Sequence, residues 1–180
     1  MTLTQAAFGA DTFTKKLALV LGGSLFIALA AQVSVPFFPV PMTLQTLAIL
    51  IVGLSFGARL GAVTLLAYLA EGAAGLSVFA NGGAGFAYMM GPTGGFLLGF
   101  VAMAYVAGLA AGRGMVTMLV ASFAAAALIY LPGLAWPAAM LGKTMPELLS
   151  GWMLPFLAGD ALKAVLAVMA VAGGMKLLAK

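Results

Sequence analysis

The chain has 180 residues, of which 64% are hydrophobic and only 7% are charged, with a formal net charge of +4 at pH 7. Soluble domains carry about 25% charged residues, so this composition cannot cover a water-facing surface and predicts an integral membrane protein. Cysteine and histidine are both absent, so disulfides are excluded and we expect no metal or other cofactor. The cations stand singly or in pairs rather than in nucleic-acid-binding clusters, so we expect no nucleic-acid partner.

A polar lead precedes the first long apolar segment. Residues 1–16 include Asp11, Lys15 and Lys16, and about 19 uncharged residues follow them. That run is longer than the core of a typical signal peptide. We therefore predict that residues 17–35 form the first transmembrane helix and are not cleaved.

A proline-rich segment separates the first predicted helix from the second. Pro36, Pro39 and Pro41 interrupt the helix and favour an extended backbone, because proline lacks an N–H and restricts the residue before it. Two further transmembrane helices are predicted over residues 42–56 and 60–76.

The second half of the chain contains three more apolar segments long enough for helices. These helices are predicted over residues 93–112, 115–131 and 155–175. A glycine-rich connector, 81–95, leads to the first of them, and a polar connection over 133–154 leads to the last. The sequence thus predicts an all-α membrane protein, a compact bundle of six transmembrane helices in a single domain over residues 1–180.

The positive charges are distributed unevenly between the two sides of such a bundle. Six spans place both termini on one side, together with Lys15, Lys16, Arg59, Arg113, Lys176 and Lys180. The other side holds only Lys143. The positive-inside rule then makes both termini cytoplasmic, and the orientation places the chain as a multi-pass protein of the cell membrane.

Two opposite charges, Asp160 and Lys163, interrupt the first half of the last predicted helix. An ionisable group within a membrane span is costly and usually faces a partner charge, the protein interior or a bound solute. Their spacing places both on one helix face. They form either an ion pair that only neutralises itself, or a site where Lys163 binds an anionic group and Asp160 accepts from a ligand N–H.

Three polar residues earlier in the chain, Tyr68, Glu71 and Asn81, are predicted on the same side of the membrane and are also candidates for the site. Glu71, which follows Tyr68 near the end of the third predicted helix, either pairs with Lys163 across the bundle or binds a ligand directly. Asn81 lies among glycines that let the backbone approach a ligand closely, although asparagine is also an ordinary turn residue.

Thr43 and Gln45 open the second predicted helix, directly after the prolines. Thr43 is also a suitable residue to begin a helix, whereas an amide such as Gln45 in an apolar run needs a polar partner. Tyr130, Trp136 and Trp152 are expected to form an interfacial aromatic belt, with stacking on a solute as the alternative.

Neither nucleotide hydrolysis nor other catalysis is expected. The segments GPTGGF and GRGMV lack the Gly-x4-Gly-Lys-Ser/Thr pattern, and without histidine no nucleophile–base pair is evident. We therefore expect binding or transport of a solute rather than an enzyme.

Three segments resemble the BioY family, the substrate-binding S components of energy-coupling-factor (ECF) biotin transporters. They are VPFFPVPMTLQTLAILIVG (35–53), YLAEGAAGLSVFANGGAGFAYMMGPTGGFLLGF (68–100) and FLAGDALK (156–163). The resemblance implies six helices, a high-affinity biotin pocket on the outer side and a covering loop between the first two helices. It also implies a transmembrane coupling protein and paired ATPases as partners, which drive the S component to topple and release its vitamin inside.

The same resemblance implies roles for particular residues. Asp160 and Lys163 match the family's Gly-Asp-x-x-Lys motif, and Asn81 matches its loop asparagine. The carboxylate of biotin suits Lys163, and its ureido ring suits Asp160 and Asn81. Some members carry an arginine where this chain has Leu97. A stand-alone carrier of biotin or another small anion, and a structural subunit whose charge pair is a packing device, are the alternative functions.

Overall fold

The computed structural model describes residues 2–9 and 12–178; Asp11 and Lys180, which the charge pattern included, lie outside the described residues. The α-helices are α1 (Leu3–Phe8), α2 (Phe13–Gln32), α3 (Gln45–Phe56), α4 (Ala58–Ala73), α5 (Gly85–Met89), α6 (Gly94–Gly108), α7 (Met115–Leu128), α8 (Tyr130–Leu141), α9 (Met145–Leu148) and α10 (Leu154–Leu178). Short strands β1 (Ser34–Val35) and β2 (Met42–Thr43), a 3-10 turn η1 (Ala80–Gly82) and a π-helical turn η2 (Leu149–Met153) complete the described elements.

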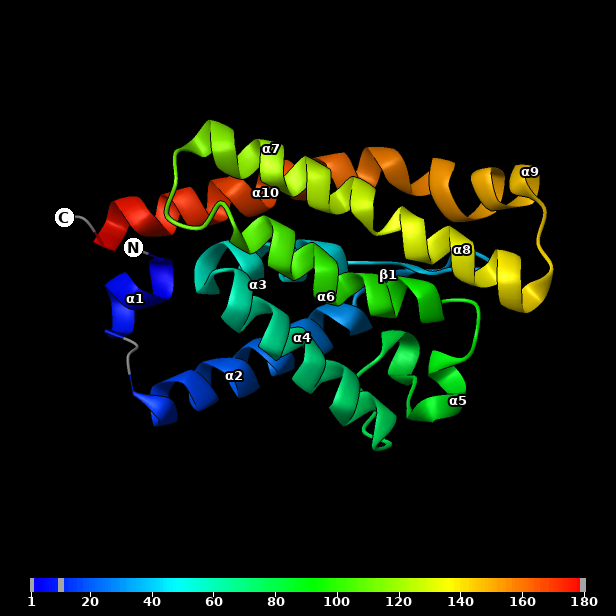
Figure 1. Cartoon of the computed structure of the whole chain (residues 1–180), viewed down its shortest axis with the longest axis horizontal. Coiled ribbons are helices and arrows are strands. Elements are labelled where there is room, and N and C mark those ends of the chain that lie inside the picture. Colours follow the sequence, from blue (N-terminus) through cyan, green and yellow to red (C-terminus); the bar gives the residue numbers. More distant parts are fainter. Residues whose placement is uncertain (1, 10–11, 179–180) are drawn as a thin grey trace.

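Helix α6 lies at the centre of the bundle and packs against α3, α4, α7 and α8 (Figure 1). Glycines make these approaches close. A Cβ on Gly53 of α3 would lie 2.6 Å from the carbonyl oxygen of Ala104 in α6, and one on Gly108 would lie 2.4 Å from the backbone nitrogen of Ala58. Small residues let helix backbones meet in this way, which is the usual mode of packing in membranes.

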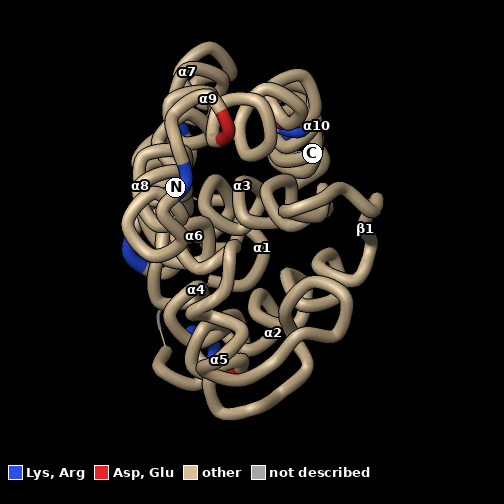
Figure 2. Tube along the Cα trace, turned by 90° about the vertical axis from the view of Figure 1, so that its right-hand side faces the viewer, with Lys and Arg blue, Asp and Glu red and all other residues tan. Residues whose placement is uncertain are grey.

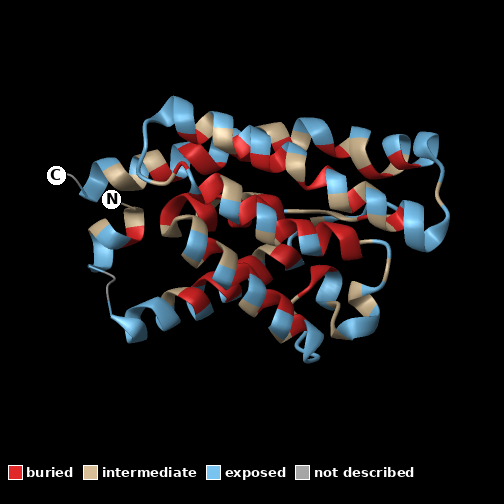
Figure 3. Ribbon diagram, in the orientation of Figure 1, coloured by how far each residue is buried: buried red, intermediate tan, exposed pale blue. Residues whose placement is uncertain are grey.

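The outer faces of the bundle are apolar. Buried residues line the inner faces of the helices and exposed residues the outer ones (Figure 3). On α2, for example, Leu21, Leu25 and Leu29 are all exposed. Few charged residues interrupt the trace (Figure 2). A continuous apolar surface of this extent is suited to lipid rather than water, so the predicted membrane protein is supported.

Three described helical segments are long and apolar enough to cross a membrane, namely Phe13–Gln32, Met115–Leu141 and Met145–Leu178. Gln45–Phe56 and Gly94–Gly108 are apolar but shorter. At 1.5 Å per residue, the 12 residues of α3 span about 18 Å, well below the thickness of about 30 Å of a bilayer core. The mostly helical fold therefore agrees with the predicted all-α class, while three of the described segments reach the length of a full span.

The polar connection predicted over residues 133–154 is largely helical, which differs from the prediction. Helix α8 continues almost directly from α7, and Pro132 lies in its first turn, where a missing N–H is tolerated. Gly133 packs so closely on Phe96 that an added Cβ would lie 2.5 Å from the ring. The Pro-Gly pair thus starts a second helix on the surface of α6 instead of ending the span.

The proline-rich segment is not helical, as predicted, but it bends at residues 38–40 instead of staying extended, and its flanks pair as a two-stranded antiparallel ladder. Ser34 pairs with Thr43, and Val35 pairs with Met42. We call residues 36–41 between the strands the proline loop. The loop packs near α10: the ring centroids of Phe37 in the loop and Phe156 in α10 lie 6.2 Å apart.

The two ends of the bundle differ in charge. Both chain ends lie at one end, which we call the terminal end; the starts of α2 and α4, the α6–α7 connection and the end of α10 lie there too (Figure 1). These segments carry Lys15, Lys16, Arg59, Arg113 and Lys176. The proline loop, α5 and α9 lie at the opposite end, the loop end, where Lys143 forms a 3.0 Å ion pair with Glu147.

Candidate functional site

Asp160 and Lys163 lie on one face of α10 and point into the bundle at its loop end. Their relative exposures are only 6% and 8%, and the Lys163 Nζ lies 3.3 Å from Oδ1 of Asp160. The shared helix face is therefore as predicted from their spacing. Two charges buried together in a membrane protein need further polar partners, because each loses its hydration.

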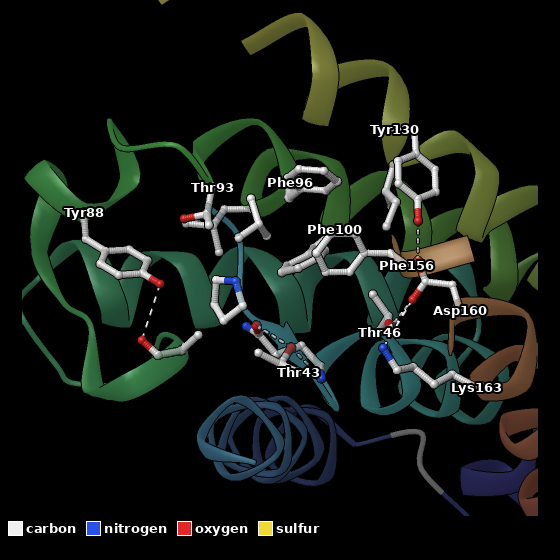
Figure 4. A pocket seen from close by; sticks show the side chains of 16 residues that line it. Thr43, Thr46, Tyr88, Thr93, Phe96, Phe100, Tyr130, Phe156, Asp160 and Lys163 are labelled. Carbon is white, nitrogen blue, oxygen red and sulfur yellow. Dashed lines mark hydrogen bonds and ion pairs between the residues drawn. The ribbon is translucent and has the colours of Figure 1, made fainter. Parts of the chain in front are cut away.

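Hydroxyl groups from two other helices hold the Asp160 carboxylate. The Oγ1 of Thr46, in the first turn of α3, donates to Oδ1 over 3.1 Å, and the hydroxyl of Tyr130, at the start of α8, donates to Oδ2 over 2.7 Å (Figure 4). With Lys163, three donors surround one acceptor-only group. Asp160 is thus the point at which α3, α8 and α10 are joined.

A cavity of about 60 Å³ lies beside this charge pair. Asp160, Lys163 and Thr46 gather at one end of it, and Tyr88 and Thr93 lie at the other, with Phe96 and Phe100 between them (Figure 4). Val40 and Pro41 of the proline loop and Phe156 of α10 complete much of the wall. The cavity is therefore elongated, with polar groups at both ends and an aromatic middle.

Thr43 and Gln45 also line the cavity, and Tyr68 supports them from behind. The Thr43 Oγ1 donates to Oε1 of Gln45 over 2.9 Å, and the Nε2 of Gln45 donates to the Tyr68 hydroxyl over 2.8 Å. Tyr68 is fully buried and donates in turn to the carbonyl oxygen of Val78 over 2.9 Å. Tyr68 is not among the residues lining the cavity, so it positions Gln45 instead.

Glu71 lies outside the cavity lining and has a different partner from the one considered in the sequence. Its carboxylate accepts a hydrogen bond from the hydroxyl of Ser24 on α2. Lys163 pairs with Asp160 on its own helix, so the predicted alternative of a Glu71–Lys163 ion pair across the bundle is wrong. The structure does not bring Glu71 to the charge pair.

Asn81 lies next to the cavity without lining it. It is exposed and has a left-handed backbone with φ of +56°, a conformation that asparagine tolerates better than most residues. Its Oδ1 accepts a 2.8 Å hydrogen bond from the Oγ of Ser34 in β1, while its neighbour Ala80 lines the cavity. Asn81 thus ties the glycine-rich connector to the base of the proline loop.

The comparison with protein families agrees with these features. The family model described as the BioY family matches residues 2–180. The chain belongs to the BioY family. The family resemblance seen in the sequence is therefore confirmed.

Curated relatives within the BioY family match most of the chain. The probable biotin transporter BioY of Pyrococcus horikoshii is 40% identical over 148 residues, which cover 81% of this chain and 88% of the relative. The biotin transporter BioY of Rhizobium etli is 34% identical over 154 residues, which cover 79% and 82%.

A solved structure shares the fold. It is the crystal structure of the S-component for biotin from an ECF-type ABC transporter, which matches with a TM-score of 0.81 and covers 91% of this chain and 92% of that chain. Because the two sequences are 24% identical, the match shows a common fold.

Two residues that bond to Asp160 in this BioY-family chain, Thr46 and Tyr130, are not predicted as site residues from the sequence. Tyr130, expected in an interfacial belt, is buried and bonded to Asp160. Thr46 follows Gln45 directly and was not singled out. The useful signal was the need of a buried carboxylate for several donors, but sequence alone could not say which hydroxyls would supply them.

The two tryptophans also differ from the expected belt. Trp152 is buried, and Trp136 is half-buried with its Nε1 donating to the carbonyl oxygen of Gly91 over 3.0 Å. Both rings pack within the helical bundle, so burial rather than interfacial exposure describes them better.

Leu97 lines the cavity and is 3% exposed, so an apolar side chain stands where some family members have arginine. Lys163 is the one cation among the described residues that line this cavity. Any anionic group bound there therefore has a single positively charged partner.

Proposed function

We propose that this chain binds biotin in the cavity beside Asp160 and Lys163 and serves in biotin uptake as the S component of an ECF-type transporter. The observation that carries the proposal is a lone cation, Lys163, buried at one end of an elongated aromatic cavity in a BioY-family fold. Biotin is proposed as the ligand because the relatives are named as biotin transporters.

The shape and chemistry of the cavity suit a molecule with two polar ends and an apolar middle. The biotin carboxylate would bond to the Lys163 ammonium, because charge-assisted hydrogen bonds are strong in a dry site. The thiophane ring and chain would contact Phe96 and Phe100. The ureido group would then lie towards Thr93 and Tyr88, on the side of the cavity where Asn81 holds the connector.

In this proposal Asp160 mainly fixes Lys163 in place. A carboxylate offers about four lone-pair positions, and three are already used by Thr46, Tyr130 and Lys163. About one position is left, but with the ureido group at the opposite end of the cavity no N–H of biotin would reach it, so the ligand-acceptor role considered for Asp160 in the sequence is not part of this proposal. Gln45 and Thr43, held by Tyr68, add amide and hydroxyl groups along the wall.

The proline loop would act as the cover of the cavity. Val40 and Pro41 form part of the wall, and the volume of about 60 Å³ has room for only a few water molecules. A vitamin needs a larger space, so the loop and its neighbours would have to move as the ligand enters. The β1–β2 ladder and the Ser34–Asn81 hydrogen bond fix the base about which such movement would occur.

For the membrane topology we propose six spans with both termini cytoplasmic, formed by α2, α3, α4, α6, α7 with α8, and α10. The cations of the terminal end support this orientation by the positive-inside rule. The cavity would then open to the outside of the cell membrane. The partners would be a transmembrane coupling protein and a pair of ATPases, which this non-enzymatic chain needs for energy.

Titration calorimetry on the detergent-purified chain tests the proposal. We expect saturable one-to-one binding of biotin and no binding of octanoate, which has a carboxylate but no ureido group. A folded protein without saturable biotin binding would reject the proposal. Uptake of labelled biotin by cells with and without the coupling protein and ATPases then separates an S component, which needs them, from a stand-alone carrier.

A further inference from the structure

A second and larger cavity lies at the terminal end of the bundle, away from the Asp160–Lys163 pair. Its volume is about 420 Å³, and its wall combines the last turns of α10, the start of α7, the α6–α7 connection and Leu3 of α1. Much of the wall consists of methionines, namely Met115, Met118, Met169 and Met175. Met118 is buried, whereas Met115 and Met169 are exposed, so the cavity extends from the interior to the outer surface.

Two cations from different segments lie on this apolar wall. Arg113 follows α6, and Lys176 lies in the last turn of α10. Neither forms an ion pair within residues 2–9 and 12–178. The acids in those residues, Glu71, Glu147 and Asp160, are absent from its lining. Among the described residues, the cavity thus combines two cations that have no acidic partner with a methionine-lined interior.

We propose that this cavity binds one anionic phospholipid, with its phosphate held between Arg113 and Lys176 and the upper part of an acyl chain along the methionines. Arginine and lysine are the usual partners of phosphate groups, and basic pockets between membrane helices are typical headgroup sites. Flexible, polarisable methionine side chains fit irregular chains well. A free phosphate ion would use the two cations but would gain nothing from the apolar wall.

Gly173 offers a way to fill this cavity without disturbing the bundle. It lines the cavity from α10, and an added Cβ there would meet no atom within 4 Å. A phenylalanine at this position would therefore occupy the space proposed for the acyl chain and leave both cations in place. Gly22 on α2 is a matched control, because it also has open space around it but faces a different groove.

Native mass spectrometry of the purified chain tests the proposal with phosphatidylglycerol, compared with phosphatidylcholine of the same acyl chains. We expect one phosphatidylglycerol to stay bound where phosphatidylcholine does not. The double variant Arg113→Ala, Lys176→Ala should bind it at least about tenfold more weakly, since both charged contacts are lost. The control, Lys16→Ala with Arg59→Ala, removes equal charge from another cavity of the terminal end and should keep the lipid.

The second pair of variants tests whether the acyl chain, and not only the phosphate of the headgroup, is bound in the cavity. Gly173→Phe should lose phosphatidylglycerol while Gly22→Phe retains it, with thermal unfolding used to check that every variant is folded. Equal loss in the two charge variants would show nonspecific surface attraction and overturn the proposal. Retention by Gly173→Phe, or displacement of the lipid by millimolar inorganic phosphate, would also overturn it. None of these outcomes depends on biotin binding, so the proposed function can fail independently.

Discussion

The hydroxyl of Tyr130 donates a 2.7 Å hydrogen bond to Oδ2 of Asp160, which joins the start of α8 to α10 inside the bundle. Thr46 and Lys163 occupy the other carboxylate oxygen. The Lys163 ammonium makes no other hydrogen bond within the described part of the chain, so two of its three hydrogens are free to bond a ligand. Asp160 therefore joins three helices, and it also holds the Lys163 ammonium in position to bind a ligand.

Replacing the cation should have the largest effect on binding. We expect Lys163→Ala to weaken biotin binding by about 2 to 5 kcal/mol, because a buried charge-assisted contact is lost. Calorimetry with biotin and its neutral amide gives the measurement. The amide should bind the wild type weakly and should be affected little by the substitution, since it lacks the carboxylate.

A matched control for this variant is Lys143→Ala, which removes an exposed lysine from the same end of the bundle. It should leave the affinity unchanged. If Lys163→Ala weakened biotin and its amide equally, Lys163 would bind some other part of the vitamin. An unchanged biotin affinity would remove Lys163 from the site altogether.

Removing the Tyr130 hydroxyl should cost stability as well as binding. In Tyr130→Phe the Asp160 carboxylate loses one donor in a buried position, and we expect a decrease of about 1 to 3 kcal/mol in the free energy of unfolding. Thermal unfolding in detergent, with and without biotin, measures this change. The control is Tyr105→Phe on α6, because Tyr105 is 46% exposed and its variant should behave like the wild type. Equal melting temperatures for the two variants would contradict the junction.

Two glycine substitutions should have opposite effects on stability. A Cβ on Gly95 would lie 2.1 Å from the carbonyl oxygen of Pro132, so Gly95→Ala should force α6 and α8 apart and destabilise by about 1 to 3 kcal/mol. In Gly22→Ala the new methyl meets nothing within 4 Å, and the higher helix propensity of alanine should stabilise by up to about 1 kcal/mol. Melting curves compare the two, and a stabilised Gly95→Ala would contradict the close packing of α6 on α8.

The features that the sequence predicted correctly are those with a local physical signature. Asp160 and Lys163 stand out as charges in an apolar run, and their spacing places them on one helix face. The three prolines indicate a break between two helices, because each lacks the N–H that a continued helix would use. Both predictions needed only neighbouring residues.

The features that the sequence could not predict depend on contacts between distant residues. Tyr130 lies 30 residues from Asp160, and nothing in its neighbours distinguishes a belt residue from a buried one. Pro132 and Gly133 look like a helix end, and only their packing on α6 shows that they begin α8. Glu71 found its partner in Ser24, one of several small residues on α2.

The proposed movement of the proline loop can be tested because the chain has no cysteine, so introduced thiols are unique. Gly151 lies where an added Cβ would be 3.6 Å from Cδ of Pro39, so the two positions are neighbours across the loop and η2. The double variant Pro39→Cys, Gly151→Cys can be joined by a short bifunctional thiol reagent. Joining the loop to η2 should hinder entry of biotin.

We expect biotin to associate much more slowly with the joined protein than with either single-cysteine variant treated with the same reagent. Association of labelled biotin, followed by rapid filtration, gives the rates. Biotin bound before joining should dissociate more slowly for the same reason, because entry and exit would share the loop as their route. Association at the rate of the single variants would show that biotin reaches Lys163 by another path, between helices rather than beneath residues 36–41.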